Sequence, residues 1–500
     1  MTTNANLSVV ESLEPQAVWR LFAEMSAVPR ASKHEEKIRA HVRKTAEGFG
    51  FQVREDQLGN IVIEVPASPG CEKAPPTVLQ GHVDMVCEKN ADTQHDFDND
   101  PIRLIVEKDA ESGEQIVRAD GTTLGADNAI GVAMALAAAK SPDVVHGPLE
   151  ILCTVDEEMG MSGAKVLTPE FFKGRRMLNL DSEEDDRIYI GCAGGCDTNL
   201  TWPLKTSAPP AGADICRVVV SGLKGGHSGG DIHLNRGSAI KLLIETLRGA
   251  GQPQLQLAEL VGGSKRNAIP REARAVVAGP VGLAKSLSDA ARRFESEARA
   301  QGEPGCSIRV EKHAAEAVAA ADETQRVMAT MIGLPHGVLA VVPDIPGLVQ
   351  TSNSMSTVEC EGDPSAGTLR VTIGCLSRSS SKFQLHTVVR QIAAIGYLGG
   401  ADVESGNEYP GWQPNVDSPT LAVCRRVYQE LFGEEPEVTA IHAGLECGLI
   451  GERIGGGQMD MVSFGPRIEG AHSPDERTYV ESVAKSYEYL VAVLRELAKA

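Results

Sequence analysis

Short apolar runs and helical periodicities alternate along the chain from its start to Ile190. Apolar side chains at helical spacing predict helices over residues 15–28 and 34–49, and an Ala-rich run predicts another over 129–139. Continuous apolar runs of strand length occur at 61–65, 77–80, 149–155 and 176–180. This alternation is typical of an α/β domain with a mainly parallel sheet that is covered by helices.

The pattern changes after Gly195. Residues 203–213 are rich in Pro, Ala and Gly and have no periodicity, which indicates a crossing between domains. Beyond them, two similar segments each combine an apolar strand, a polar stretch and a helix: 217–248 and 370–395. The pattern therefore predicts an inserted α+β domain over 204–398, and it leaves open whether that domain is a duplicated unit.

From Gly399 onward the chain returns to the first pattern. Residues 418–432 read as a helix capped by Ser418, residues 437–441 and 461–464 as strands, and residues 479–497 as a long closing helix. We therefore expect both ends of the chain, 1–203 and 399–500, to form one domain around the inserted one.

Charge and cysteine content narrow the function classes. The chain has 48 basic and 68 acidic residues, a net charge of −20, which argues against binding to nucleic acid or to an anionic membrane. Its longest apolar run, 129–139, is shorter than the roughly 20 residues needed to span a bilayer. Eleven scattered cysteines and no visible secretory signal lead us to expect free thiols and a cytoplasmic location.

Acidic and histidine side chains follow the predicted strands at the ends where α/β proteins bind ligands. They are His82, Asp84, Asp127, Glu157, Glu158, Asp181 and His472. Each alone is more typical of a cap, a turn or a solvated surface. If they converge, however, five carboxylates share one cavity and require a cation. Imidazole with carboxylate suits zinc, and also cobalt or manganese, and two ions about 3.5–4 Å apart are typical of two-metal hydrolases.

These motifs, in this order, resemble the metallopeptidase M20 family, and most of all its aminoacyl-histidine dipeptidases. The matching segments, which span nearly the whole chain, are GHVDMV at 81–86, GADN at 125–128, DEEMG at 156–160, LDSE at 180–183, GGHSG at 225–229 and GAHS at 470–473. The resemblance implies a di-zinc catalytic domain with an inserted lid, and two Zn²⁺ per chain, with Co²⁺ or Mn²⁺ as alternatives.

The resemblance also implies a role for each position. One zinc would be bound by His82 and Asp181 and the other by Glu158 and His472, with Asp127 bridging both. Glu157 would be the general base, and Asp84 would orient His82. The family often has a cis peptide after its bridging Asp, here between Asp127 and Asn128.

In the inserted domain, the resemblance implies groups that handle the substrate. His227 would stabilise the oxyanion, in its own chain or in a partner's, so that lid closure would be part of turnover. Arg378 would bind the substrate's C-terminal carboxylate, and Asn267 and Gly444 would supply further contacts. His442 and Glu446 are expected near this pocket, and a homodimer through the lid domain is a further expectation.

The implied activity is hydrolysis of Xaa-His and other unblocked dipeptides, including β-alanyl-histidine, by a water molecule that two metals activate. Glu157 would take the proton of that water and give it to the leaving amine. Two alternatives stay open: an amidohydrolase of N-acyl amino acids, and a non-catalytic metal-binding protein on the same fold. The intact Glu157 disfavours the second, because a binding protein needs no base.

Overall fold

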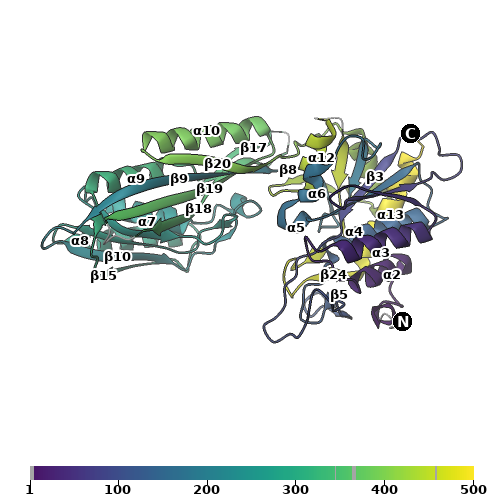
Figure 1. The fold of residues 1–500 in the computed structure, drawn as a ribbon, viewed down its shortest axis with the longest axis horizontal. Helices are drawn as coiled ribbons and strands as arrows, with labels where there is room; N and C mark the ends of the chain where they lie inside the picture. The colour runs from purple at the N-terminus through teal and green to yellow at the C-terminus, as the bar shows by residue number, and fades with distance from the viewer. Residues whose placement is uncertain (1–4, 344, 363–366, 456–458, 500) are drawn as a thin grey trace. The chain divides into compact units, whose positions relative to one another are not determined.

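The computed structural model describes residues 5–343, 345–362, 367–455 and 459–499, which form two compact units (Figure 1). The first unit comprises Met1–Gly191, Pro414–Ala440 and Leu445–Ala500, so it contains both ends of the chain. The second comprises Cys192–Gln413 and the short segment Ile441–Gly444.

An eight-stranded sheet forms the centre of the first unit. Its four central strands are parallel, in the order β6 (Leu149–Thr154), β3 (Thr77–His82), β7 (Arg176–Asn179) and β22 (Asp460–Ser463). The flanking strands are β1 (Gln52–Glu55) and β2 (Ile61–Val65) on one side and β8 (Arg187–Cys192) and β21 (Glu437–Ile441) on the other. The parallel centre confirms the predicted fold class and aligns the carboxyl ends of its strands.

Helix α4 (Ala126–Lys140) packs against β3 in the interior of this unit, and α2 (Gln16–Ser26) packs against α4. Ala and Gly residues let α4 approach closely: a Cβ atom on Gly131 would lie 2.4 Å from the carbonyl oxygen of Leu180. The other helices of the unit are α1 (Ala5–Val9), α3 (Glu36–Gly48), α5 (Glu157–Gly160), α6 (Ser162–Val166), α11 (Pro419–Phe432), α12 (Glu446–Gly455) and α13 (Val480–Leu497).

A small antiparallel sheet, which the sequence pattern did not predict, completes the first unit. Its order is β23 (Ile468–Glu469), β24 (Arg477–Tyr479), β5 (Gln115–Ala119) and β4 (Leu104–Lys108). The pairing of β5 with β24 joins segments that are far apart in the sequence. The loop between β23 and β24 contains His472, so this sheet anchors a segment that carries one of the predicted site residues.

The second unit is built on a ten-stranded antiparallel sheet. Its main path is β15 (Ser307–Lys312), β10 (Asp214–Ser221), β14 (Ala273–Gly279), β12 (Gln256–Gly262), β18 (Val349–Glu361), β19 (Thr368–Ser379), β9 (Gly194–Ser207) and β16 (Val318–Ala319). Two further strands pair with it, β17 (Gly337–Val341) with β18 and β20 (Asp402–Tyr409) with β9. The helices are α7 (Ala239–Gly249), α8 (Leu283–Ala300), α9 (Ala321–Gly333) and α10 (Lys382–Leu398), and their apolar side chains share one core with the sheet.

The bounds of the two units differ from the expected domain bounds. Strand β9 runs through residue 203 and β20 follows residue 399, so both expected crossings fall within the second unit. Both helices of the two similar segments begin after a serine cap, Ser238 for α7 and Ser381 for α10. The duplication and the role of this unit as a lid stay predictions. Among the described helices, none combines the length and the apolar character that crossing a membrane requires.

Candidate metal centre

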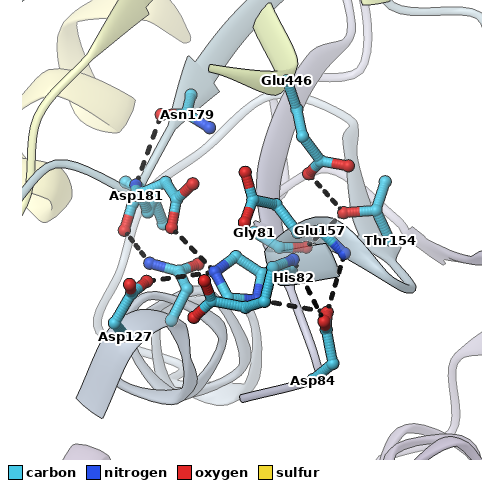
Figure 2. A network of polar contacts seen from close by, with 12 residues as sticks. Gly81, His82, Asp84, Asp127, Thr154, Glu157, Asn179, Asp181 and Glu446 are labelled. Atoms are coloured by element: carbon cyan, nitrogen blue, oxygen red, sulfur yellow. Dashed lines mark hydrogen bonds and ion pairs between the residues drawn. The ribbon is translucent and has the colours of Figure 1, made fainter. Parts of the chain in front are cut away.

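His82, the last residue of β3, lies at the centre of a cluster of carboxylates (Figure 2). Its Nε2 atom is 3.0 Å from Asp127 Oδ1 and 3.2 Å from Asp181 Oδ1, and its Nδ1 atom is 3.3 Å from Asp84 Oδ1. Asp181 follows β7, the parallel neighbour of β3, so the sheet itself places His82 and Asp181 together. The side chain of His82 is only 1% exposed.

Asp127 lies at the start of α4, and its two carboxylate oxygens face two different imidazoles. Oδ1 faces His82, while Oδ2 is 3.4 Å from Nε2 of His472. The peptide bond between Asp127 and Asn128 is cis, as the resemblance implied. The side chain of Asn128 donates to the carbonyl oxygen of Leu180 at 2.6 Å, which ties this end of α4 to the end of β7.

His472 approaches from the loop between β23 and β24. Its Nε2 atom is 2.9 Å from Glu158 Oε2, and its side chain is 54% exposed. Segments as distant in the sequence as those of Glu158 and His472 therefore meet at one cluster.

Asp84 organises the segment that carries both glutamates. Its two oxygens accept hydrogen bonds from the backbone N–H groups of Glu157 and Glu158, at 3.1 and 3.2 Å. The hydroxyl of Ser32 donates to Asp84 at 2.8 Å. Because the same carboxylate lies beside Nδ1 of His82, Asp84 fixes the imidazole relative to the first turn of α5.

Crowding of acids shifts the protonation equilibria of this cluster. Burial raises the pKa of Glu157 well above its usual range, and the neighbouring carboxylates add to this effect although His82 opposes it. Burial also raises the pKa of Asp181 to about 7. Hydrogen bonds to Asp127 and Glu158 raise the pKa of His472 to about 11. The crowded carboxylates of this cluster therefore stabilise a positive charge that is placed among them.

This donor set fits a divalent metal ion. Ligand atoms of His82, Asp127 and Glu158 all lie within 4.8 Å of one another. Within the described part of the chain, the buried Oδ1 atom of Asp181 has no hydrogen-bond partner, although Nε2 of His82 lies 3.2 Å away, so this oxygen is available to bind a cation. Imidazole and carboxylate together are the ligands that zinc, cobalt and manganese prefer.

Apart from Glu446, the other predicted site residues lie in the second unit, and three of them surround Gly229. His227 lies in β11 (Gly226–His227), and Arg378 lies near the end of β19. A Cβ atom on Gly229 would lie 3.1 Å from both the Cε1 atom of His227 and the Nε atom of Arg378, and 2.2 Å from the carbonyl oxygen of His442. Burial and the positive charge of Arg378 lower the pKa of His227.

Arg378 is only 4% exposed and donates from Nη1 to the hydroxyl of Tyr409 at 2.6 Å. His442 is also buried, and its Nε2 atom is 2.7 Å from the hydroxyl of Ser352. Burial, reinforced by Arg378, lowers the pKa of His442 to about 3. The lowered pKa keeps the imidazole of His442 neutral beside the guanidinium of Arg378.

Asn267 and Gly444 lie on backbone segments that are held in place in the same unit. The carbonyl oxygen of Asn267 accepts from the N–H of Ser228, the residue after His227, at 2.8 Å. Gly444 ends the segment Ile441–Gly444, where Ala443 accepts from the N–H of Ala193 at 3.0 Å. Asn267 is thus tied to the chain next to His227.

Glu446, which we expected near the substrate pocket, is fully buried in the first unit. Its Oε2 atom accepts a hydrogen bond from Gln80 at 2.7 Å. The same atom accepts one from Thr154 at 2.5 Å (Figure 2). Burial raises the pKa of Glu446 to about 8. It joins the first turn of α12 to β3 and β6, close to their carboxyl ends.

Sequence reasoning missed Glu476, a buried residue four positions after His472. Its carboxylate lies against the backbone that precedes Asp127. The only signal in the sequence is its place beside the GAHS motif, because a carboxylate that binds backbone N–H groups has no spacing rule of its own.

A family model, a related sequence and solved structures all match this chain to peptidases. Residues 78–496 match peptidase family M20/M25/M40. The chain is 41% identical to the cytosol non-specific dipeptidase of Escherichia coli K12, over 98% of this chain and 99% of that protein. The crystal structure of aminoacylhistidine dipeptidase from Vibrio alginolyticus matches with a TM-score of 0.87 and 40% identity, covering 97% of this chain and 98% of that one. A tripeptidase from Staphylococcus aureus, at 15% identity and a TM-score of 0.56, shares the fold.

Proposed function

The chain belongs to peptidase family M20/M25/M40, and from this premise we propose that it is a metal-dependent dipeptidase. Its substrates are Xaa-His and other unblocked dipeptides, including β-alanyl-histidine. Two relatives that are 41% and 40% identical over nearly the whole chain are both named as dipeptidases, which supports a small-peptide substrate.

One observation carries this proposal: the carboxylate of Asp127 lies between two imidazoles, with one oxygen toward His82 and the other toward His472. A carboxylate in that position is suited to bridge two cations. We assign His82 and Asp181 to one Zn²⁺ and Glu158 and His472 to the other, with Asp127 shared. Co²⁺ and Mn²⁺ suit the same donors.

The residues around the centre suit peptide hydrolysis. Two divalent ions held there supply an acidified water molecule and a polarised scissile carbonyl. Glu157 is the base that takes a proton from the attacking water and returns it to the leaving amine. Asp84 keeps Nε2 of His82 directed toward Asp127 and Asp181, because it lies beside the other ring nitrogen.

We assign the recognition of the substrate to the second unit. Arg378 binds the C-terminal carboxylate, because its planar guanidinium offers two parallel donors. His227 donates to the oxyanion, and Asn267 and Gly444 contact the backbone of the dipeptide. The grouping of His227 and Arg378 around Gly229 supports these roles.

We further propose a cytoplasmic homodimer that forms through the second unit. β20 pairs with β9 on one side, and no described strand pairs with its other side. Phe383, Tyr397 and Leu398 of α10 are exposed apolar side chains on the same unit. The structure describes all eleven cysteines and joins none of them in a disulfide, as expected in a reducing compartment. Light scattering of the purified protein should give twice the chain mass, and the monomer mass would contradict the dimer.

A substrate panel tests the proposed function directly. The zinc-loaded protein should hydrolyse Ala-His, β-Ala-His and Ala-Ala with kcat/KM values at least 100-fold above those for N-acetyl amino acids. The reverse preference would make the protein an amidohydrolase of N-acyl amino acids. Bound metal without hydrolysis of either class would indicate a non-catalytic binding protein.

A further inference from the structure

The carboxylate of Glu476 is surrounded by the backbone N–H groups that open α4. Its Oε2 atom accepts from Leu124 at 2.8 Å and from Gly125 at 2.9 Å. Its Oε1 atom accepts from Ala126 at 2.8 Å and, at a longer 3.4 Å, from Asp127 itself. With a residue exposure of 1%, Glu476 makes these bonds out of contact with solvent.

Neighbouring residues shape this arrangement. Gly125 has a φ of +69°, and a Cβ atom there would lie 2.4 Å from Arg30 Nη2 and 2.8 Å from the sulfur of Met85. The same Arg30 nitrogen donates to the carbonyl oxygen of Gly125 at 2.8 Å. Backbone N–H groups in the first turn of a helix have no partner within the helix, so a carboxylate is a strong acceptor for them.

The loop that carries Glu476 also carries His472, and it is closed by its own hydrogen bonds. Ser473 donates from its hydroxyl to the carbonyl oxygen of Gly470 at 2.7 Å. The N–H of Glu476 donates to the carbonyl oxygen of Ser473 at 3.1 Å. A displacement of Glu476 is therefore transmitted to His472 through a short, internally bonded turn.

We propose that Glu476 is a positioning residue for the metal centre: its single carboxylate holds the segment of Asp127 and the loop of His472 in one fixed relation. This inference rests on the proposed two-metal assignment. It goes beyond that assignment because Glu476 binds no metal and touches no substrate. It acts through two ligands, Asp127 and His472, that lie far apart in the sequence.

The geometry makes the effect of Glu476 unequal for the two ions. His82 ends β3 and Asp181 follows the parallel neighbour β7, so the sheet positions both residues without help from Glu476. Asp127 is shared by both ions, but only the other ion also depends on His472, so two of its ligands belong to the segments that Glu476 joins. Loss of the carboxylate should therefore weaken binding of the second ion far more than binding of the first.

Cobalt titration of the metal-depleted full chain tests this inequality. The variants are Glu476→Gln, which keeps the size of the side chain but replaces one acceptor by a donor, and Glu476→Asp, which keeps the charge but shortens the reach. Glu469→Gln is the matched control, since Glu469 lies in β23 of the same hairpin and pairs with Arg467 and Arg477 instead. Visible absorption of Co²⁺ reports its coordination, and competition with a chelator gives the affinity of each equivalent.

We expect wild type and the Glu469→Gln control to bind two equivalents alike. Glu476→Gln should bind the first equivalent within about 3-fold of wild type and the second about 10- to 100-fold more weakly, the range typical when a group that orients a ligand is removed. The affinity of Glu476→Asp for the second equivalent should lie between those of wild type and Glu476→Gln. If the glutamine variant does not fold, the aspartate variant tests the role of Glu476 in the same way: its second equivalent should be weakened more than its first.

Unchanged affinity for both equivalents, or an equal loss of both, would overturn the role of Glu476. A wild-type chain that hydrolyses Ala-His yet binds a single equivalent would overturn the two-metal assignment and the inference with it. A wild-type chain that binds two equivalents but cleaves no dipeptide would refute the proposed function alone, and the comparison of Glu476→Gln with Glu469→Gln would still decide the positioning role.

Discussion

At the scale of single residues, the centre depends on a few carboxylates that each serve two partners. Asp127 faces two imidazoles, and Asp84 contacts both His82 and the first turn of α5. Removing one such carboxylate therefore removes its contacts with both partners at once. Glu157 differs, because Asp84 holds its backbone N–H rather than its side chain.

Glu157→Gln tests the base without changing the size of the side chain. General acid–base groups contribute about 100- to 10,000-fold to a rate, so kcat for Ala-His should fall by that factor. The metal content should stay at the wild-type level, because the assigned ligands are unchanged. Initial rates and metal analysis of the same preparation check both points, and a wild-type rate would remove Glu157 from the mechanism.

His442 makes stability depend on pH. Burial and Arg378 lower its folded-state pKa to about 3, whereas an unfolded histidine titrates near 6.5. A lowered histidine pKa contributes stability that is present above about pH 6.5 and is lost as the pH falls below it, since the unfolded state then binds the proton first. Between pH 6.5 and 5 this loss amounts to about 2 kcal/mol.

His442→Gln should remove that part of the pH dependence. Urea unfolding at pH 7 and pH 5 gives the free energy of unfolding, and the variant should lose about 2 kcal/mol less than wild type between the two values. An identical loss in both proteins would show that His442 is not held neutral in the folded state.

The cluster could be predicted from the sequence because most of its residues lie at the carboxyl ends of parallel strands, where α/β proteins bind ligands. His82, Glu157, Glu158 and Asp181 all lie at or directly after the ends of strands in a parallel sheet, and that position is visible in the hydrophobic pattern. Glu476 could not be found in this way. Its role depends on backbone N–H groups that any residue type except proline supplies, so no residue pattern marks its partners.

At the scale of elements, α4 shows how close packing places a site residue. Its small side chains let it lie against β3 and bring Asp127 to the carboxyl end of the sheet. The turn that begins it is equally constrained, since Gly125 has a positive φ and stands within contact distance of Arg30.

Gly125→Ala should therefore destabilise the protein. The added methyl group meets Arg30 Nη2 in a backbone conformation that favours glycine, and we expect a loss of roughly 2–4 kcal/mol in the free energy of unfolding. Gly48→Ala in α3 is the matched control, because a Cβ atom there has no neighbour within 4 Å. It should be neutral or stabilise by up to about 1 kcal/mol. Equal effects of the two substitutions in thermal unfolding would contradict this account of the turn.

Elements of the second unit were the hardest to predict. The strand β18 buries Ser352, Asn353 and Ser354, so it lacks the apolar run by which a buried strand is recognised. These polar groups find partners only in the folded sheet, as when Ser377 donates to Asn353 at 2.9 Å. The central strands of the first unit were predicted correctly because they are mostly apolar.

At the scale of the whole molecule, the net charge of −20 and the acidic centre both favour the binding of cations. Carboxylates crowded at one end of a sheet repel one another unless cations neutralise them. Metal binding should therefore contribute to the stability of the first unit as well as to catalysis.

Removal of metal by a chelator should lower the melting temperature of the protein. A ligand at about 1,000 times its Kd stabilises the folded state by about 4 kcal/mol, which for a unit of this size corresponds to roughly 5–15 °C. Adding Zn²⁺ back should restore the original value. Calorimetric scans of the three samples check this, and an unchanged melting temperature after verified metal removal would contradict a structural contribution.

Anomalous X-ray diffraction at the zinc edge, from crystals grown with zinc, tests the central claim most directly. We predict two peaks about 3.5–4 Å apart. One should lie beside His82 and Asp181 and the other beside Glu158 and His472, with Asp127 between them. A single peak, or peaks away from Asp127, would contradict the account.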